Sequence, residues 1–571
     1  MKTRYIVPLL LFCLFACMAC EDDKTEMPRL FRPSFIASSC FAEDNTITLA
    51  WRTSGEATSY TVELSQDATF QSEKLETQTV EHGKCVFTNL RYETKFYARV
   101  RANNESLAIT SNWTEMGSSI STLSRTIPKI LYAVEGSRIS ETSVEIKWVV
   151  SEKNPVDGLA IWEEGTTEER QISLENASAG QYTITGLTPR ITYYVALTNS
   201  AAPEGAEKYN QQRFTTAGMP ADAVVVEDGV DLMDKIKAGM TDASKQALVF
   251  QLKNGVDYYL TAGGEVAAKT GDIKLTKSIA LLANPGERPT LYIREGCFNV
   301  KPESGNMPDI EYFVVDNVNI KETWTDSKPS KGSKTRLLNI GKHDAGTDFT
   351  IDRFEITNSD IVLPSAVLMM SDASEGVTTI NHIRIDNCLV SGINTSAVTK
   401  QFGFIHAINK GSNVWNDVSV TNSTFYEFYI SPGVFGAPTA NVPIAAGNKV
   451  VISNCTFYNW GSNKDGKNTY RAVGNFSKLT APLNLSVNNC VFGSSESKVL
   501  DAGGINLDSK GNYCTSDFEK MSDAGLTLIS LDTDDASLFR NIEENDFTVI
   551  DAGSVIYKSE YGDPRWITVL D

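Results

Sequence analysis

The first part of the chain contains two stretches with the same hydrophobic and polar pattern. Residues 47–64 (ITLAWRTSGEATSYTVEL) and 144–162 (VEIKWVVSEKNPVDGLAIW) each consist of an alternating strand with a tryptophan, a short turn and a second alternating strand. Trp51 and Trp148 are 97 residues apart. A repeat of this length with a core tryptophan predicts two immunoglobulin-like β-sandwiches in tandem.

A second landmark repeats with the same period. Leu90 opens the strand LRYETKFYARVRA and Leu187 opens LTPRITYYVALTN, again 97 residues apart. The second module resembles the fibronectin type III family, whose pattern of Leu, Pro, Tyr and Val is met by Leu187, Pro189, Tyr193 and Val195.

The first module departs from that pattern, since Tyr92 stands at the proline position and Phe96 at the corner tyrosine position. We place the two modules at residues 28–124 and 125–217. The simplest interpretation is a spacer that holds the rest of the chain off a membrane, and direct ligand binding is the alternative.

From residue 220 to residue 571 the pattern changes to a repeat of short buried strands. Leu232, Met233 and Ile236 lie on one side of a predicted short helix, and a strand is predicted at 247–252. Six later segments fit the template apolar-x-apolar-x-Asn-x-x-apolar, with the Asn residues separated by 41, 29, 35, 32 and 35. The template asparagines are Asn317, Asn358, Asn387, Asn422, Asn454 and Asn489.

A fixed motif at a varying spacing is typical of a solenoid, in which each coil keeps its strands and varies its loops. By strand alternation the Asn side chain should point inward, and asparagines about 4.8 Å apart could form a hydrogen-bonded ladder at a tight turn. Cys388, Cys455 and Cys490 follow the Asn in three coils. We interpret them as small residues at a crowded turn; a redox or metal thiol row is the alternative, and a Cys455–Cys490 bridge stays open.

The coil region resembles the right-handed parallel β-helix of the pectate-lyase type, in which a capping helix precedes a strand ending in Gly-x-Tyr, here near Gly255–Tyr258. More narrowly, it resembles a family of β-helix domains of unknown function in Bacteroidetes surface lipoproteins, often encoded beside glycan-uptake genes. That resemblance rests on the Asn coils, on GINLDSKGNYCTSDF at 504–518 and on GDPRW at 562–566. It implies an all-β chain in which Trp566 plugs the open end of the solenoid and Arg565 pairs locally.

Residues 1–20 (MKTRYIVPLLLFCLFACMAC) are typical of an export signal, because Lys2 and Arg4 precede an apolar stretch too short for a dependable transmembrane span. Cys20 follows an alanine and precedes EDDK, which resembles the surface-export signal of Bacteroidetes lipoproteins. Cys17 is the alternative lipidation site. We therefore expect a lipid-anchored protein on the cell surface, at the outer membrane.

Charge narrows the possible partners. The chain carries 52 Lys and Arg against 71 Asp and Glu, a formal charge of −19, which becomes −21 without the two cations of residues 1–20. Nucleic acid is therefore not an expected partner. Residues 218–571 carry 31 Lys and Arg against 44 Asp and Glu, or −13, so a polyanion would be repelled unless calcium or a local cation cluster intervened.

Candidate site residues concentrate in two long segments of neighbouring coils, 401–415 and 459–476. Aromatic rings there would stack on sugar faces, and cations would bind sugar carboxylates or supply the base of a lyase. The plainer interpretation is a set of solvated loop charges with a rim aromatic. The candidates for the base are Lys410, Lys467, Arg471 and His406, and those for ligand binding are Trp415, Trp460 and Tyr470.

Three functions are compatible with these patterns. The leading one is a surface lipoprotein that binds polysaccharide through its β-helix, with other glycan-uptake proteins as possible partners. The alternative is a polysaccharide lyase that acts on uronate-containing glycans by β-elimination, with Ca²⁺ as its cofactor. The third is an adhesion or structural spacer protein. With four His and no CxxC pair, a metal cluster is not expected.

Overall fold

The computed structural model describes residues 29–570 with gaps. The export segment, including Cys17 and Cys20, lies outside the described residues. In the described part of the chain, no helix is long and apolar enough to cross a membrane. The gaps are 73–74, 230, 261–270, 295, 323–335, 365–366, 373–374, 393–402, 409–412, 429–432, 437–447, 461–469, 477–482, 496, 502–504 and 520–525.

The chain divides into two compact units. One unit contains the chain up to Thr126 together with Ser200–Glu207, and the other contains Ile127–Asn199 and Lys208–Asp571. The second sandwich and the coil region therefore belong to one unit. The boundaries expected at 28–124, 125–217 and 220–571 stay predictions.

The first unit contains a sandwich of antiparallel sheets around Trp51, which is 2 % exposed. Alternation along β7 buries every second side chain, as the pattern of the sequence predicts. One sheet contains β1 (Ser34–Phe35), β2 (Phe41–Glu43), β3 (Thr46–Arg52) and β6 (Lys84–Phe87). The other contains β4 (Ser59–Ser65), β5 (Leu75–Val80), β7 (Lys95–Asn104), β8 (Ile109–Thr110), β9 (Thr114–Glu115) and β10 (Ile120–Ser121).

The second sandwich packs around Trp148, which is 4 % exposed. The hydroxyl of Tyr193 accepts a hydrogen bond of 3.1 Å from the backbone N–H of Thr188, which is the corner arrangement that the Leu-Pro-Tyr-Val pattern predicts. One sheet pairs β11 (Ser143–Lys147) with β14 (Gln181–Thr185). The other contains β12 (Gly158–Glu163), β13 (Arg170–Ser173), β15 (Thr192–Thr198) and β16 (Lys208–Thr215).

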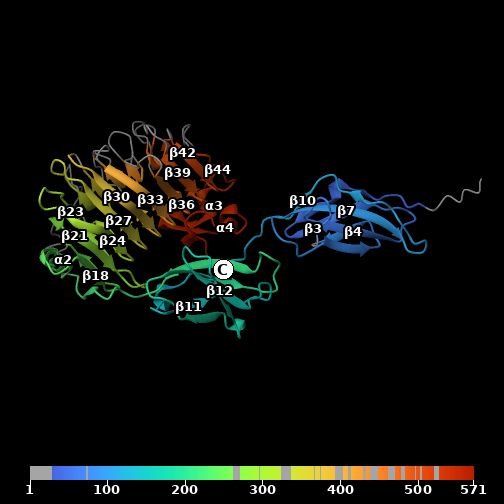
Figure 1. Ribbon diagram of the computed structural model, residues 1–571, viewed down its shortest axis with the longest axis horizontal. Helices are drawn as coiled ribbons and strands as arrows, with labels where there is room; N and C mark the ends of the chain where they lie inside the picture. The colour runs from blue at the N-terminus through green and yellow to red at the C-terminus, as the bar shows by residue number, and fades with distance from the viewer. Residues whose placement is uncertain are drawn as a thin grey trace, which may run out of the picture. The chain divides into compact units, whose positions relative to one another are not determined.

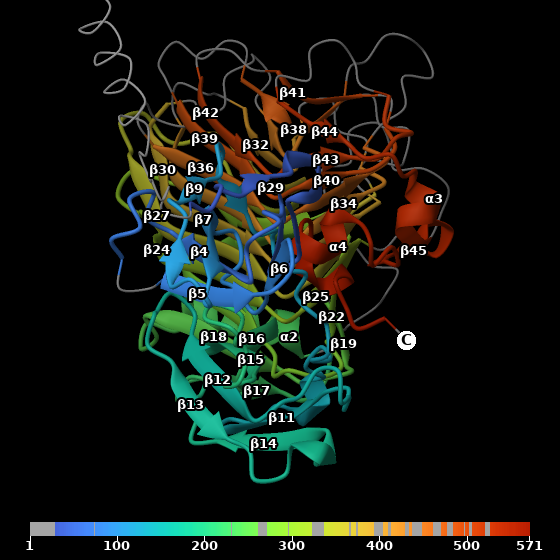
Figure 2. The same cartoon turned by 90° about the vertical axis from the view of Figure 1, so that its right-hand side faces the viewer.

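The rest of the second unit, here called the three-sheet domain, consists of three long parallel sheets that the chain visits in turn (Figures 1 and 2). The first sheet contains β17 (Val224–Val226), β18 (Ala247–Leu252), β21 (Lys277–Leu282), β24 (Asp309–Asp316), β27 (Phe349–Thr357), β30 (Thr378–Asp386), β33 (Asn413–Thr421), β36 (Lys449–Ser453), β39 (Leu483–Asn488) and β42 (Ile505–Lys510). The second contains β19 (Asp257–Tyr259), β22 (Thr290–Ile293), β25 (Asn319–Glu322), β28 (Asp360–Val362), β31 (Leu389–Ser391), β34 (Thr424–Tyr426), β37 (Thr456–Tyr458), β40 (Val491–Phe492), β43 (Tyr513–Cys514) and β44 (Ile529–Ser530). The third contains β20 (Gly271–Leu275), β23 (Gly296–Val300), β26 (Arg336–Ile340), β29 (Val367–Ser371), β32 (Ile405–Ala407), β35 (Phe435–Gly436), β38 (Arg471–Asn475) and β41 (Lys498–Asp501).

The beginning of this domain follows the sequence pattern. Helix α2 (Leu232–Thr241) buries Leu232, Met233 and Ile236, and the predicted strand at 247–252 is β18, so both predictions are confirmed. Successive strands stack matching apolar side chains in the interior; for example, the rings of Phe425 and Phe457 lie 5.3 Å apart on neighbouring strands. Such rows form one continuous core along the domain.

The template asparagines form the turns between the first and second sheets. All six have left-handed backbone, with φ from 50° to 58°. The prediction that their side chains point into the core is wrong: each is half-buried, and the residue after it is the buried one. A left-handed residue reverses the chain locally, so it interrupts the period-2 alternation on which the prediction depended. The buried residues, each 0 % exposed, are Val318, Ser359, Cys388, Ser423, Cys455 and Cys490.

The asparagine ladder is present but interrupted. Asn454 donates to Asn422 at 3.3 Å and accepts from Asn489 at 3.2 Å. Asn422 donates instead to the carboxylate of Asp386, at 2.8 Å. Burial raises the pKa of the Cys388 thiol to about 12, which fits a small packing residue better than a reactive one. The cysteines at 455 and 490 are free thiols, so no bridge joins them.

The chain ends against the outer face of the second sheet. Trp566 donates to the hydroxyl of Thr424 in β34 at 2.7 Å, several strands before the last strand of that sheet, so the prediction that Trp566 plugs the open end is wrong. Local pairing of Arg565 is confirmed, because its guanidinium lies 2.7 Å from Asp563. This segment contains α3 (Asp535–Leu538), β45 (Phe539–Asn541), β46 (Asp546–Val549), α4 (Val555–Ser559) and the 3-10 turn η7 (Pro564–Trp566).

Candidate functional site

The outer face of the third sheet carries a row of three polar side chains and one methionine. Asn299, Asn339, Met370 and His406 stand side by side on successive strands, and they alternate with residues that fill the core. Asn339 donates to Asn299 at 2.6 Å, and Arg336 donates to the side-chain oxygen of Asn339. Asn299 and Asn339 are half-buried, whereas Met370 and His406 are each 1 % exposed.

A charged cluster lies further along the same sheet. Arg471 in β38 stands opposite Lys498 in β41, and both reach the carboxylate of Asp501. Two guanidinium nitrogens of Arg471 contact Asp501, and the Lys498 ammonium lies 3.0 Å from it. Both cations therefore meet at the carboxylate of Asp501, and their side chains are mostly buried.

His406 is buried on the outer face of this sheet. Its ring is 1 % exposed, and Nδ1 accepts a hydrogen bond of 3.1 Å from the backbone N–H of Gly403. Burial, aided by the charge of Arg336, lowers the pKa of His406 to about 4. At neutral pH His406 is therefore uncharged and shielded from solvent, a poor position for a base that must reach a substrate.

The aromatic candidates differ in position. Trp415 and Trp460 are 0 % exposed and belong to the core, so the expectation that they stack on sugars conflicts with their placement. Trp415 points inward because the alternation of β33 (Asn413–Thr421) shifts by one residue at positions 416–417, so Trp415 is buried together with Val418 and Val420. Trp460 donates to the carbonyl of Lys498 at 2.8 Å. Its indole thus holds the backbone of Lys498, a residue of the charged cluster. Tyr470 is half-buried directly before β38.

The remaining candidates, Lys410 and Lys467, lie outside the described residues. The structure therefore brings Tyr470, Arg471 and His406 to one sheet and leaves the two lysines unplaced. Among the described residues, no group of three or more His, Cys, Asp or Glu side chains is arranged to hold a metal ion.

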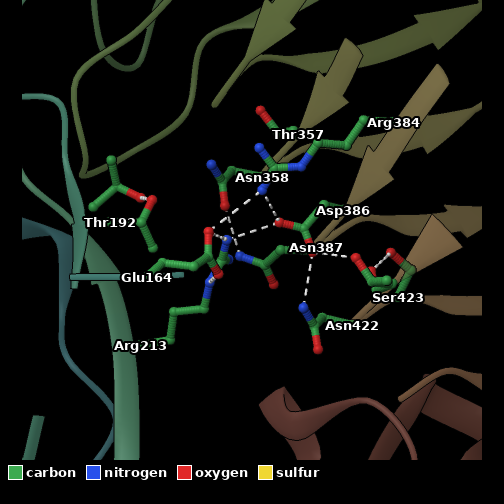
Figure 3. Close-up of polar contacts among 12 residues, drawn as sticks. Glu164, Thr192, Arg213, Thr357, Asn358, Arg384, Asp386, Asn387, Asn422 and Ser423 are labelled. Atoms are coloured by element: carbon green, nitrogen blue, oxygen red, sulfur yellow. Dashed lines mark hydrogen bonds and ion pairs between the residues drawn. The ribbon is translucent and has the colours of Figure 1, made fainter. Parts of the chain in front are cut away.

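A second polar centre, which the sequence reasoning missed, joins the second sandwich to the three-sheet domain (Figure 3). Asp386, the last residue of β30, is 2 % exposed and accepts from Arg213 of the sandwich at 2.8 Å and from Arg384 at 2.9 Å. Its other oxygen accepts from Thr421 and Asn422 of the next coil. Burial by itself would raise the pKa of Asp386. The charges of Arg213 and Arg384 and the hydrogen bonds from Thr421 and Asn422 outweigh burial and lower this pKa below its usual value.

A sequence signal for this centre exists in the residue before each template Asn. In four successive coils that position reads Asp316, Thr357, Asp386 and Thr421. Each Asp accepts bonds from the Thr of the following coil, at 2.7 Å in both cases. An acidic residue at this regular turn position therefore indicated that a polar group pairs with it. The sequence did not indicate that Arg213 is one of the partners of Asp386.

Further contacts fix the sandwich on the three-sheet domain. The ammonium of Lys129, whose side chain is 0 % exposed, pairs with Glu560 after α4. The backbone N–H of Gly218 donates to Asn284 at 2.9 Å. A buried lysine without its partner would be costly, so these contacts make separation of the two parts unfavourable.

One comparison with known proteins matches part of the chain. A family described as a domain of unknown function (DUF5123) matches residues 450–566, from β36 to the GDPRW segment, so the predicted resemblance to a family of unknown function is confirmed for that part. No curated protein matches the chain. Among solved structures, the FN1–FN3 domains of chicken CNTN1 match at 15 % identity with a TM-score of 0.15, over 34 % of this chain and 69 % of that chain. A similarity this low carries no argument.

Proposed function

We propose that the protein is a cell-surface lipoprotein, anchored through Cys20 or alternatively Cys17, that binds polysaccharide as part of a glycan-uptake system. In this proposal the three-sheet domain is a right-handed parallel β-helix of the pectate-lyase type, and the two sandwiches are fibronectin type III modules. The regular succession of three parallel sheets and the Asn turns support the first assignment. The Tyr193 corner supports the second.

The observation that carries the proposal is the charged cluster on the outer face of the third sheet. Arg471 and Lys498 both contact the carboxylate of Asp501, and a sugar carboxylate could bind the same two cations. Amides of Asn299 and Asn339 on the same face can bind hydroxyl groups. We expect binding of polysaccharides that carry carboxylates.

The described residues favour binding over β-elimination. Arg471 contacts Asp501 through two nitrogens, which suits a fixed cation rather than a proton acceptor. His406 is buried. A lyase would have to use Lys410 or Lys467, and that alternative stays a proposal.

Affinity gel electrophoresis with pectin, glycosaminoglycan and neutral polysaccharides tests the binding function. We expect retardation by a uronate polymer, weakened at least fivefold in Lys498→Ala. Lys510→Ala is the matched control, because Lys510 lies on β42 of the same domain with its side chain 81 % exposed. No retardation by any polysaccharide, or equal loss in both variants, would count against the proposal. Steady release of an unsaturated product from uronate polymers would replace it with the lyase.

A further inference from the structure

A cavity of about 430 Å³ lies between the second sandwich and the asparagine turns of the three-sheet domain, within one compact unit. Arg190 and Arg213 line it from the sandwich, and Asp316, Glu355 and Arg384 line it from the three-sheet domain. Small-molecule sites typically have volumes of about 300–1,000 Å³ and often occur where domains meet. The cavity thus has the size and location of a ligand site.

The walls of this cavity are held at a fixed separation. The buried pairs of Asp386 with Arg213 and of Lys129 with Glu560 join the two sides. Nearby, Gly136 approaches the other wall so closely that a Cβ there would lie 2.5 Å from the amide nitrogen of Gly286. A cavity with fixed walls binds a ligand without first paying for their ordering.

The cavity offers more hydrogen-bond donors than its own residues use. Among the described residues, Arg288 donates only to Asp360, at 2.7 Å. Arg190 donates to the carbonyl of Gly218 at 3.3 Å and makes a long contact with the sulfur of Met219. Each guanidinium carries five N–H donors, so both arginines keep donors for a ligand.

Acceptors are also available. Oδ1 of Asp316 accepts from Thr357 and Asn358, whereas Oδ2 has no hydrogen-bond partner in the described part of the chain. Glu355 has only a contact of 3.7 Å with Arg353 there. The same cavity therefore presents carboxylate acceptors beside guanidinium donors.

The charges of the lining nearly cancel. Four arginines and three carboxylates line the cavity, so an anion or a cation would meet groups of its own sign. A hydroxyl group donates and accepts, and it carries no charge. The geometry points to a neutral, polyhydroxylated ligand, a segment of a neutral oligosaccharide, bound between the second sandwich and the asparagine turns. This site is separate from the charged cluster on the third sheet and does not depend on it.

Calorimetric titration of the full chain with neutral hexasaccharides of glucose, xylose and mannose tests the inference. We expect at least one to bind, and Glu355→Trp, which places an indole in the cavity beside Arg384 of the neighbouring strand, to weaken binding at least tenfold. Glu311→Trp is the matched control: it places the same side chain at an exposed position of the same sheet, outside the cavity lining, and binding should stay within twofold. Lys498→Ala should also leave neutral binding unchanged.

Hydrogen exchange gives a measurement that needs no variant. With the oligosaccharide bound, exchange should slow at residues 355–358 and 384–387 and stay unchanged at 471–475 and 498–501. Absence of binding by every neutral hexasaccharide would overturn the inference. So would binding that Glu355→Trp leaves intact, or protection confined to the third sheet.

Discussion

Replacement of Asn454 separates the two roles that the ladder asparagines combine. Its amide donates to Asn422 and accepts from Asn489, and its backbone has φ of 52°. Loss of two hydrogen bonds costs about 2 kcal/mol, at about 1 kcal/mol each. A left-handed backbone costs alanine about 1–2 kcal/mol and costs glycine little. Unfolded glycine has more conformational freedom to lose on folding, which reduces the difference between the two variants by about 0.5–1 kcal/mol.

We therefore expect Asn454→Gly to lower the free energy of unfolding by about 2 kcal/mol and Asn454→Ala by about 3 kcal/mol. Equilibrium unfolding in urea, monitored by circular dichroism, measures both values. Asn545 is the matched control, because it also has left-handed backbone, with φ of 60°, but its side chain makes no hydrogen bond to a described residue. There the glycine variant should be nearly neutral, and the alanine variant should lose about 1 kcal/mol.

These variants separate the contribution of the ladder bonds from that of the left-handed backbone. If Asn454→Gly were as stable as the parent protein, the ladder bonds would contribute nothing. If alanine and glycine were equally destabilising at both positions, the left-handed turn would not be the reason for asparagine there.

Three further predictions concern buried groups. Burial raises the pKa of Asp563 from 3.8 to about 6, against the opposing charge of Arg565, so the folded state binds this proton more tightly than the unfolded chain. The stability that this group contributes should be complete below pH 4 and fall by about 3 kcal/mol as the pH rises through 6. Urea unfolding of Asp563→Asn should show an unfolding free energy that depends less on pH in that window. Trp460→Phe should lower the unfolding free energy by about 1–3 kcal/mol, because it loses the hydrogen bond to Lys498 and some of the side-chain volume. Retardation by polysaccharide should stay within twofold of that of the parent protein. A large loss of retardation at unchanged stability would instead make Trp460 a residue that contacts the polysaccharide. The Cys388 thiol, with its pKa raised to about 12, should resist alkylation at pH 8 until the chain unfolds, as mass spectrometry of alkylated peptides can measure, and rapid labelling of the native protein would contradict its burial.

Local sequence patterns predict the main elements and their order. Trp51, Trp148 and the Tyr193 pattern predicted two sandwiches, and the Asn template predicted coils with a turn at each Asn. These features follow from local rules, because strand alternation and left-handed tolerance are properties of neighbouring residues. The same rules failed at the turn itself, where the left-handed residue shifts the alternation and buries the next side chain instead.

Which side chains meet depends on the packing of distant segments. Trp415 lies in the core because the alternation of β33 shifts by one residue before Val418, and Trp460 lies there because the chain after β37 turns its indole to the carbonyl of Lys498. Arg213 and Asp386 are 173 residues apart, yet they form the buried pair that joins the sandwich to the three-sheet domain. No local pattern encodes such a pair, because its energy depends on the burial that packing of two distant surfaces creates.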